Sequence, residues 1–199
     1  QFASSFRMDF DRRLNAACQD ANLRDIVGNS MDGFRVRGII ALKLYFQKGY
    51  AEIKSSTYTK KIASLDPVHI SKELKKEIDR LFERPFDAKI FLKSLFSAYQ
   101  HLFTESQKRV LLINIHKQLW LEKQKDDFFE VSDAKKMTPY SLDEFSVDLG
   151  KLLTSRIDTL DNGYKCNIHL GAGGINIYKP NGDFNSYKYL EFERRAENG

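Results

Sequence analysis

One tripeptide in the chain, Glu52-Ile53-Lys54, has the spacing of a metal-dependent nuclease site. In a strand its carboxylate and its ammonium group would point to the same face. Such a nuclease needs a second acidic residue on a neighbouring strand, so that two carboxylates hold a divalent cation. Asp32 is an upstream candidate, but nothing around it marks a ligand. A nuclease is therefore an alternative function, and a Glu-x-Lys on an amphipathic strand is the simpler interpretation.

Two other pairs of residues have types suited to acid–base or nucleophilic chemistry. Arg109 and His116 are separated by six residues in a predicted helix, a spacing that resembles the Arg-x4–6-His motif of HEPN-type ribonucleases. Val110 replaces the polar residue usual after that Arg, which favours an ordinary long helix with a half-buried His. Cys166 and His169 share a predicted strand, where they would not form a catalytic pair without help from elsewhere in the fold.

Metal ligation is not indicated by the remaining pattern. The four histidines are scattered, and the chain has no Cys-x-x-Cys and no His-Glu-x-x-His. These are the spacings by which zinc sites are recognised. We therefore expect no metal site, no cofactor and no enzymatic activity.

Basic residues are concentrated in the first third of the chain. Residues 1–60 carry a net charge of +4 and residues 141–199 a net charge of −2. The candidate nucleic-acid-binding residues are Arg12, Arg13, Arg35, Arg37, Lys43, Lys48 and Lys54. Arg35, Arg37 and Lys43 alternate with apolar residues, so in one strand they would share a face. The alternative is a solvated sheet face, or charges that protect a strand edge.

The elements that would position these residues begin with a helix over 5–27, predicted from helical spacing of apolar residues. Alternation over 34–46, a turn at 47–49 and β-forming residues over 50–59 predict a β-hairpin. A helix over 36–46 is the competing interpretation. Residues 1–65 would thus form a basic helix and β-hairpin region.

The central segment has strong helix signals. Asp66-Pro67 predicts a helix start, with the helix ending near Phe82, and a wide apolar stripe predicts a helix over 87–103. Capping boxes at 104–107 and 141–144 predict helices over 105–123 and 142–155. Residues 124–140 are polar and irregular. Strands are expected over 164–170, 175–179 and 187–194, with turns at 171–174 and 180–183.

The order of elements over 105–194 resembles a winged-helix domain and covers about half of the chain. Winged helices place their last helix in the DNA major groove. Here that helix carries Asp143, Glu144 and Asp148, which we expect to be exposed and to repel phosphates. The resemblance therefore suggests a unit that contacts protein or forms dimers.

Together these patterns predict an α+β chain with a basic region at 1–65 and a helical core at 66–199 that ends in the winged-helix-like unit with antiparallel strands. No apolar run reaches the ~20 residues of a membrane span. Cys18 and Cys166 suggest free thiols in the cytoplasm. Because the first residue is Gln1 and not Met, we expect a fragment of a longer protein.

The expected function is a non-enzymatic binding module, a subunit of a larger assembly acting on nucleic acid. DNA would bind the basic half, and a protein partner or a second copy would bind the C-terminal unit. A scaffold or dimerisation protein that binds no nucleic acid is the second alternative.

Overall fold

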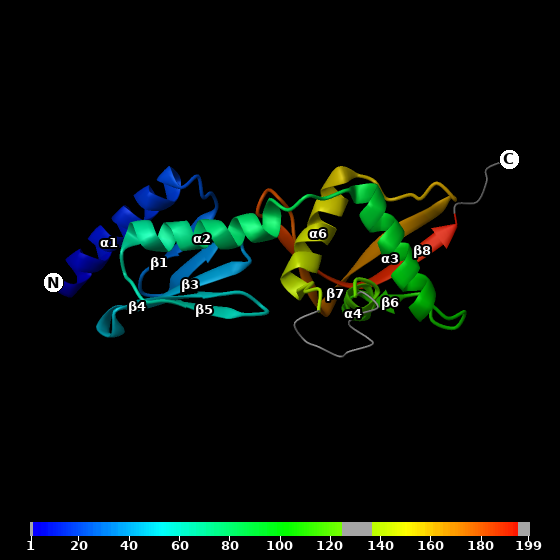
Figure 1. Ribbon diagram of the computed structural model, residues 1–199, viewed down its shortest axis with the longest axis horizontal. Helices are drawn as coiled ribbons and strands as arrows, with labels where there is room; N and C mark the ends of the chain where they lie inside the picture. The colour runs from blue at the N-terminus through cyan, green and yellow to red at the C-terminus, as the bar shows by residue number, and fades with distance from the viewer. Residues whose placement is uncertain (1, 125–136, 195–199) are drawn as a thin grey trace. The chain divides into compact units, whose positions relative to one another are not determined.

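The computed structural model describes residues 2–124 and 137–194, and the side chains from Met8 onward (Figure 1). The described residues form a mixed α+β structure with two antiparallel sheets. The chain divides into two compact units. The first is built from residues up to Arg84 together with 181–183, and the second from Pro85 onward without those three. The boundary expected from the sequence, 65/66, precedes helix α2 (Pro67–Phe82), which lies in the first unit.

The first unit is a five-stranded antiparallel sheet with two helices. Its strands, in spatial order, are β1 (Ile26–Asn29), β2 (Gly33–Val36), β3 (Ile40–Tyr45), β4 (Tyr50–Lys54) and β5 (Thr59–Ile62). A 3-10 turn (Phe46–Lys48) joins β3 to β4. Helix α1 (Phe2–Asp20) and α2 pack side by side over the sheet face that carries Phe34, Val36, Leu42 and Ile53 (Figure 1). All four of these side chains are buried, so this face forms the core of the unit.

Two boundaries in the first unit differ from the sequence predictions. The helix expected over 5–27 ends at Asp20, because Asn22 and Asp25 adopt positive φ angles of 57° and 61°, which end a helix, and Ile26 begins β1. The strand expected over 34–46 is two strands joined by a turn at 37–39. Val36 pairs with Ile40, so the turn holds three residues and inward and outward positions keep the same parity on both sides. The alternation therefore runs through the turn unchanged, and the competing helix over 36–46 is wrong.

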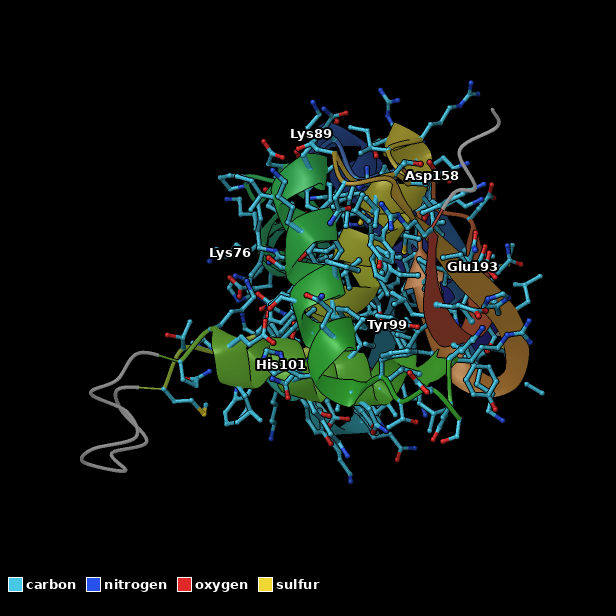
Figure 2. All side chains as sticks on the ribbon, turned by 90° about the vertical axis from the view of Figure 1, so that its right-hand side faces the viewer. Lys76, Lys89, Tyr99, His101, Asp158 and Glu193 are labelled. Atoms are coloured by element: carbon cyan, nitrogen blue, oxygen red, sulfur yellow. The ribbon has the colours of Figure 1, made fainter. Side chains whose placement is uncertain are left out.

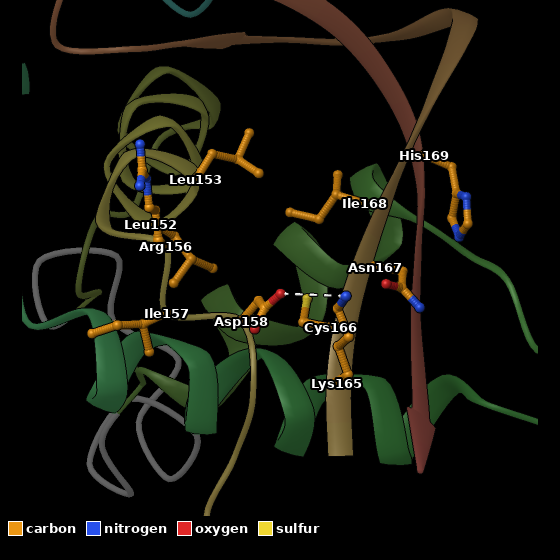
Figure 3. Close-up of a pocket in the computed structure, with 10 residues that line it drawn as sticks. All are labelled: Leu152, Leu153, Arg156, Ile157, Asp158, Lys165, Cys166, Asn167, Ile168 and His169. Atoms are coloured by element: carbon orange, nitrogen blue, oxygen red, sulfur yellow. Dashed lines mark ion pairs between the residues drawn. The ribbon is translucent and has the colours of Figure 1, made fainter. Parts of the chain in front are cut away.

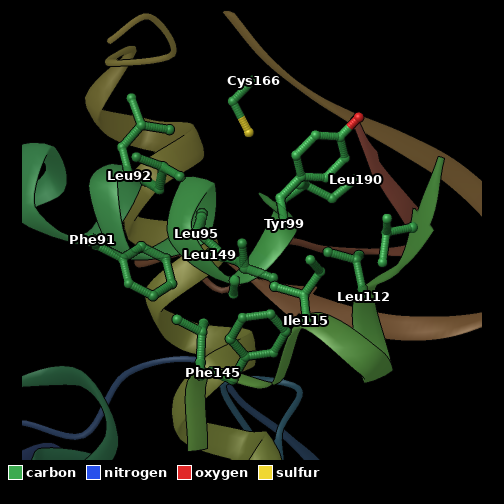
Figure 4. Packing of buried hydrophobic residues seen from close by; sticks show 14 of the residues in the cluster. Phe91, Leu92, Leu95, Tyr99, Leu112, Ile115, Phe145, Leu149, Cys166 and Leu190 are labelled. Atoms are coloured by element: carbon green, nitrogen blue, oxygen red, sulfur yellow. The ribbon is translucent and has the colours of Figure 1, made fainter. Parts of the chain in front are cut away.

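The second unit contains three helices and a three-stranded sheet among its described residues. In chain order they are α3 (Ala88–Leu102), β6 (Val110–Leu111), α4 (Leu112–Glu122), α6 (Leu142–Ser155), β7 (Tyr164–Tyr178) and β8 (Phe184–Arg194). The strands lie in the order β6-β8-β7. Apolar side chains from all six elements form one core, with Leu95, Ile115, Phe145, Leu149 and Leu190 at most 2% exposed (Figure 4).

Local capping signals located two helix starts correctly. The Asp66 carboxylate accepts hydrogen bonds from the Val68 and His69 amides, with Pro67 in the first turn of α2. Ser141 and Glu144 form the reciprocal capping box of α6.

The capping box expected at 104–107 is instead a turn, in which the Gln107 amide donates to Thr104. Val110 and Leu111 then pair with β8, and the helix begins at Leu112. The same side-chain hydrogen bond serves a turn as well as a helix start, and the pairing with β8 decides between them.

The glycine segment 171–174 does not turn the chain back as expected. Strand β7 continues through it, and both Leu170 and Ile175 pair with Tyr187, so the residues between them bulge out of the ladder. A Cβ at Gly174 would lie 2.0 Å from the Tyr187 carbonyl oxygen, so glycine is required there. The turn expected at 180–183 does join β7 to β8.

Helix α6 also differs from expectation in its acidic residues. Asp143 and Asp148 are buried, and Tyr140 donates a hydrogen bond of 2.8 Å to Asp148. Buried acids with partners do not repel a ligand at the surface, so the expected acidic face of this helix is absent. The irregular stretch predicted over 124–140 falls largely outside the described residues.

Candidate nucleic-acid interface

The sheet of the first unit has a second face that neither helix covers. Strand alternation places on it the residues that we call the outer sheet face: Val27, Arg35, Ala41, Lys43, Tyr45, Tyr50, Glu52, Lys54, Thr59 and Lys61. Four of them are basic, and all four are exposed. Glu52 is the one carboxylate in this set. The outer sheet face is therefore positively charged.

Strand pairing fixes the spacing of these charges. Arg35 and Lys54 both pair with Ala41, from opposite sides, and Lys43 and Lys61 both pair with Glu52 in the next row. Neighbouring strands lie about 4.8 Å apart, so the Cα atoms of the two basic residues in each row are about 10 Å apart. The rows are about 7 Å apart along the strands. The four basic residues thus form a staggered array of two rows, one on β2 and β4 and the other on β3 and β5.

The four cations lack acidic partners within the described part of the chain. Arg35 donates to the Gly38 carbonyl oxygen at 3.1 Å, and no described carboxylate lies within ion-pair distance of Lys43, Lys54 or Lys61. Glu52 instead accepts a hydrogen bond of 3.1 Å from the Tyr45 hydroxyl, which raises the pKa of Tyr45. These cations are therefore free to meet an external anion.

Two aromatic rings lie at one end of the array. Tyr45 and Tyr50 face each other across β3 and β4 and stack with centroids 4.6 Å apart. The Lys61 ammonium lies 4.1 Å from the centre of the Tyr50 ring, and that of Lys48 lies 6.0 Å from the Tyr45 ring. Tyr45 and Lys48 also line a pocket of about 310 Å³, whose other lining residues include Ser30 and Met31. The basic residues of the outer sheet face are thus directly adjacent to its aromatic rings.

Adjacent lysines on β5 have opposite surroundings. Lys61 belongs to the outer sheet face, whereas Lys60 points toward α2. The Lys60 ammonium lies 2.8 Å from Glu73 and 3.3 Å from Glu77 of α2, and the hydrogen bond to Glu73 raises the pKa of Lys60. Lys60 therefore ties the edge of the sheet to a helix, and Lys61 is left for a ligand.

The structure brings together part of the predicted binding set. Arg35, Lys43 and Lys54 share the outer sheet face, with Lys48 beside its tyrosines. Arg37 does not join them, because it sits in the turn with φ 48° and its guanidinium lies 4.8 Å from the Phe82 ring of α2.

Arg12 and Arg13 lie elsewhere, on the exposed side of α1, and Arg12 pairs with Asp9 at 2.6 Å. The basic and aromatic residues of the outer sheet face that the predicted set lacked are Lys61, Tyr45 and Tyr50. Tyr45 has the same parity as Lys43, so the alternation contained that signal.

The predicted alternative nuclease pair is present but lacks a second acid. Glu52 and Lys54 share the outer sheet face, and Asp32 binds the Asn29 side-chain amide in the β1–β2 turn. Across residues 2–124 and 137–194, no three His, Cys, Asp or Glu side chains are grouped to hold a metal ion. Glu52 thus has the position of a surface residue hydrogen-bonded to Tyr45.

A pocket of about 490 Å³ lies in the second unit between the end of α6 and β7 (Figure 3). Burial raises the pKa of the Cys166 thiol that lines it to about 12, so the thiol stays protonated at neutral pH. His169 lies on the opposite face of β7 and approaches Glu191 at 3.2 Å. Cys166 and His169 therefore form no catalytic pair.

The spacing of Arg109 and His116 does not produce a shared site either. Arg109 precedes β6, outside any helix, and its guanidinium lies 3.2 Å from Glu191 on β8. His116 is on α4, where its Nε2 lies 2.9 Å from the Tyr140 carbonyl oxygen and burial lowers its pKa. Both residues have structural partners.

Comparison with known proteins gives no relative: no family model, no curated protein and no solved structure matches the chain. Separately, none of the described helices combines the length and the apolar character needed to cross a membrane.

Proposed function

We propose that this chain is a non-enzymatic binding module for nucleic acid, acting as a subunit of a larger assembly. The observation that carries the proposal is the outer sheet face, where Arg35, Lys43, Lys54 and Lys61 are exposed and have no described acidic partner. These four cations suit the phosphate groups of nucleic acid, because a nucleic-acid backbone presents phosphates at regular intervals.

The size of the electrostatic effect follows from the number of cations. Each phosphate neutralised on a single strand contributes a slope of about −0.7 to the dependence of log affinity on log salt. Four contacts give a slope of about −3, which amounts to a loss of ~50-fold in affinity between ~50 and ~200 mM salt.

The second unit is proposed to be a winged-helix-like module that contacts protein. The order α3-β6-α4-α6-β7-β8 and the strand order β6-β8-β7 support this assignment. Its α6 helix, in the position of a recognition helix, is buried over most of its length, whereas a helix that enters a DNA groove needs an exposed face. A protein contact through other surfaces of the unit agrees better with this burial.

The test is fluorescence anisotropy of a labelled oligonucleotide at ~50 and ~200 mM salt. The variant Lys43→Glu/Lys54→Glu should lose ~10-fold or more in affinity and reduce the salt slope by about 1.4. Arg12→Glu/Arg13→Glu changes the net charge equally on the exposed side of α1 and should bind almost as the wild type does.

Three outcomes contradict the proposal in different ways. Equal losses in both variants would mean that net charge, and not the outer sheet face, attracts the ligand. No binding by the wild type at ~50 mM salt would leave the scaffold or dimerisation alternative. Cleavage of the oligonucleotide in the presence of Mg²⁺, abolished by Glu52→Ala, would establish the nuclease.

A further inference from the structure

We infer that the ligand of the outer sheet face is single-stranded nucleic acid, with an unpaired base stacked at the Tyr45–Tyr50 pair. This inference rests on the proposed function and adds the class of nucleic acid. It is carried by the aromatic rings of Tyr45 and Tyr50, which play no part in attracting phosphates.

The tyrosine pair is placed where a base would arrive. Both rings are partly exposed and lie on the same face as Lys43 and Lys61, one row further along β3 and β4. A strand whose phosphates follow the cations would carry its bases over this end of the sheet. Base stacking on aromatic side chains tolerates any sequence, because every base has a π face.

The surroundings of the pair are apolar as well as basic. Met31, which lines the pocket beside Tyr45, is 75% exposed. An exposed apolar side chain contributes nothing to the binding of a ligand that presents only phosphates. In a duplex each base is covered by its neighbours, whereas a single strand can turn a base onto such a surface.

The lysines at the rings provide a way for a base to enter. The Lys61 ammonium lies 4.1 Å from the centre of the Tyr50 ring, a place that a stacked base would take. A lysine side chain is flexible and has rotatable donors, so its ammonium can move from the ring to a phosphate of the incoming strand. The Lys61 ammonium thus covers one face of the Tyr50 ring in the free protein. In the complex this cation–π contact is exchanged for an ion pair with a phosphate.

Glu52 fixes the orientation of the pair. It accepts the 3.1 Å hydrogen bond from the Tyr45 hydroxyl and stands between Lys43 and Lys61 in its row. The single carboxylate of the outer sheet face therefore acts as a positioning residue, since it holds a ring against which Tyr50 stacks at an interplanar angle of 24°.

The experiment compares one single-stranded oligonucleotide with the same sequence in a hairpin duplex, both by anisotropy at ~50 mM salt. The wild type should prefer the single strand by ~10-fold or more. Tyr50→Leu should reduce single-strand affinity by ~5-fold or more and leave duplex affinity unchanged. Tyr50→Trp should keep the preference, because it keeps a stacking surface.

A matched control is available in the second unit. Tyr189 on β8 also has a lysine ammonium near its ring, that of Lys188 at 5.4 Å. Tyr189→Leu should bind both oligonucleotides as the wild type does. An oligonucleotide containing 2-aminopurine gives a second readout, because stacking quenches its fluorescence and Tyr50→Leu should restore it. Circular dichroism of each variant establishes that the fold is retained.

The outcomes separate this inference from the proposed function. Equal affinity for single strand and duplex, with no effect of Tyr50→Leu, would overturn the single-strand assignment and leave phosphate binding intact. Absence of binding to both oligonucleotides would overturn the proposed function and this inference together. A loss in Tyr50→Trp as large as in Tyr50→Leu would also overturn the stacking role.

Discussion

The two sheets of this chain differ in how many of their charged side chains have described partners. In the first unit, the cations of the outer sheet face have no described acidic partner. In the second unit, several polar side chains on or beside the sheet have described partners, among them Asp158 and Glu193, which are labelled in Figure 2. There Glu191 lies 3.2 Å from Arg109, Asn167 donates to Glu193 at 2.9 Å, and Lys165 lies 3.6 Å from Asp158.

If the outer sheet face binds nucleic acid as proposed, the pairing of charges, more than their number, distinguishes it from an ordinary solvated surface. Both units contain 16 Lys and Arg, against 12 Asp and Glu in the first and 15 in the second. Arg109 and Lys165 of the second unit each have a described acidic partner, and the four cations of the outer sheet face do not. The alternative interpretation of the basic residues, a merely solvated face, fits the second sheet better than the first.

The largest effect is expected from Gly150→Ala, which disturbs the packing of α6 against strand β7 of the second sheet. A Cβ at Gly150 would lie 1.9 Å from the Tyr178 carbonyl oxygen, so α6 and β7 would have to separate. We expect a loss of about 3 kcal/mol in the free energy of unfolding. Lys43→Ala, on the outer sheet face, should change the free energy of unfolding by less than about 0.5 kcal/mol. Urea unfolding measures both.

Each unit also carries one buried thiol that reports on its opening. Burial raises the pKa of Cys18 to about 11 and that of Cys166 to about 12, so neither reacts readily while its unit is folded. Gly150→Ala should therefore accelerate labelling of Cys166 and leave Cys18 slow. Unchanged labelling of Cys166 would show that α6 and β7 do not approach as closely as described.

The next effect comes from removing one carboxylate from each sheet. Glu191→Ala leaves Arg109 and His169 without their acid, and we expect a loss of about 1 kcal/mol in stability, since the Arg109 side chain is exposed. Glu52→Gln keeps an acceptor for Tyr45 and removes a negative charge among cations. It should leave stability unchanged and strengthen oligonucleotide binding by ~2-fold or more. Weaker binding by Glu52→Gln would contradict the assigned role of the outer sheet face.

Some of this fold could be predicted from the sequence because its signals are local. Asp66-Pro67 and Ser141 to Glu144 specify helix starts through hydrogen bonds within four residues. Strand β6 could not be predicted, because Val110 becomes extended through pairing with Leu190, far away in the chain. The turn at Arg37 was hidden, because three residues leave the alternation intact.

The candidate site, like the fold, was predictable only where its signals are local in the sequence. Parity alone placed Arg35 and Lys43 on one face, since alternation is a local property of strands. Parity could not separate Lys60 from Lys61, because the acids that engage Lys60 come from α2. Nor could it place Arg37 against Phe82, which is a contact between elements distant in sequence.

A smaller effect should separate those two neighbouring lysines. Lys60→Met removes the ion pairs to Glu73 and Glu77 and should cost about 0.5 to 1 kcal/mol of stability, with oligonucleotide affinity unchanged. Lys61→Met should do the reverse, lowering affinity ~3-fold or more without loss of stability. Urea unfolding and anisotropy on both variants make the comparison. Identical behaviour of the two would mean that β5 is not in the described register.

The smallest effect is a change in the acid sensitivity of the first unit. Hydrogen bonds from Lys60 and Lys76 lower the pKa of Glu73 from 4.5 to about 2. A carboxyl whose pKa is lower in the folded state stabilises the fold above its unfolded pKa, and that contribution is lost as the pH falls. The loss should therefore occur between about pH 4.5 and pH 2.

Lys60→Met removes the larger of the two causes, so its urea midpoint should fall less steeply than that of the wild type across this range. Other carboxylates titrate in the same range, but they do so in both proteins, and the difference between the two curves reports on the carboxylates that Lys60 engages, Glu73 and Glu77. Lys61→Met is the control and should keep the wild-type slope, because Lys61 points to the outer sheet face. Parallel curves for wild type and Lys60→Met would mean that Lys60 does not hold Glu73 ionised. The contrast between Lys60, which is paired with α2, and Lys61, which lies on the outer sheet face, would then be wrong.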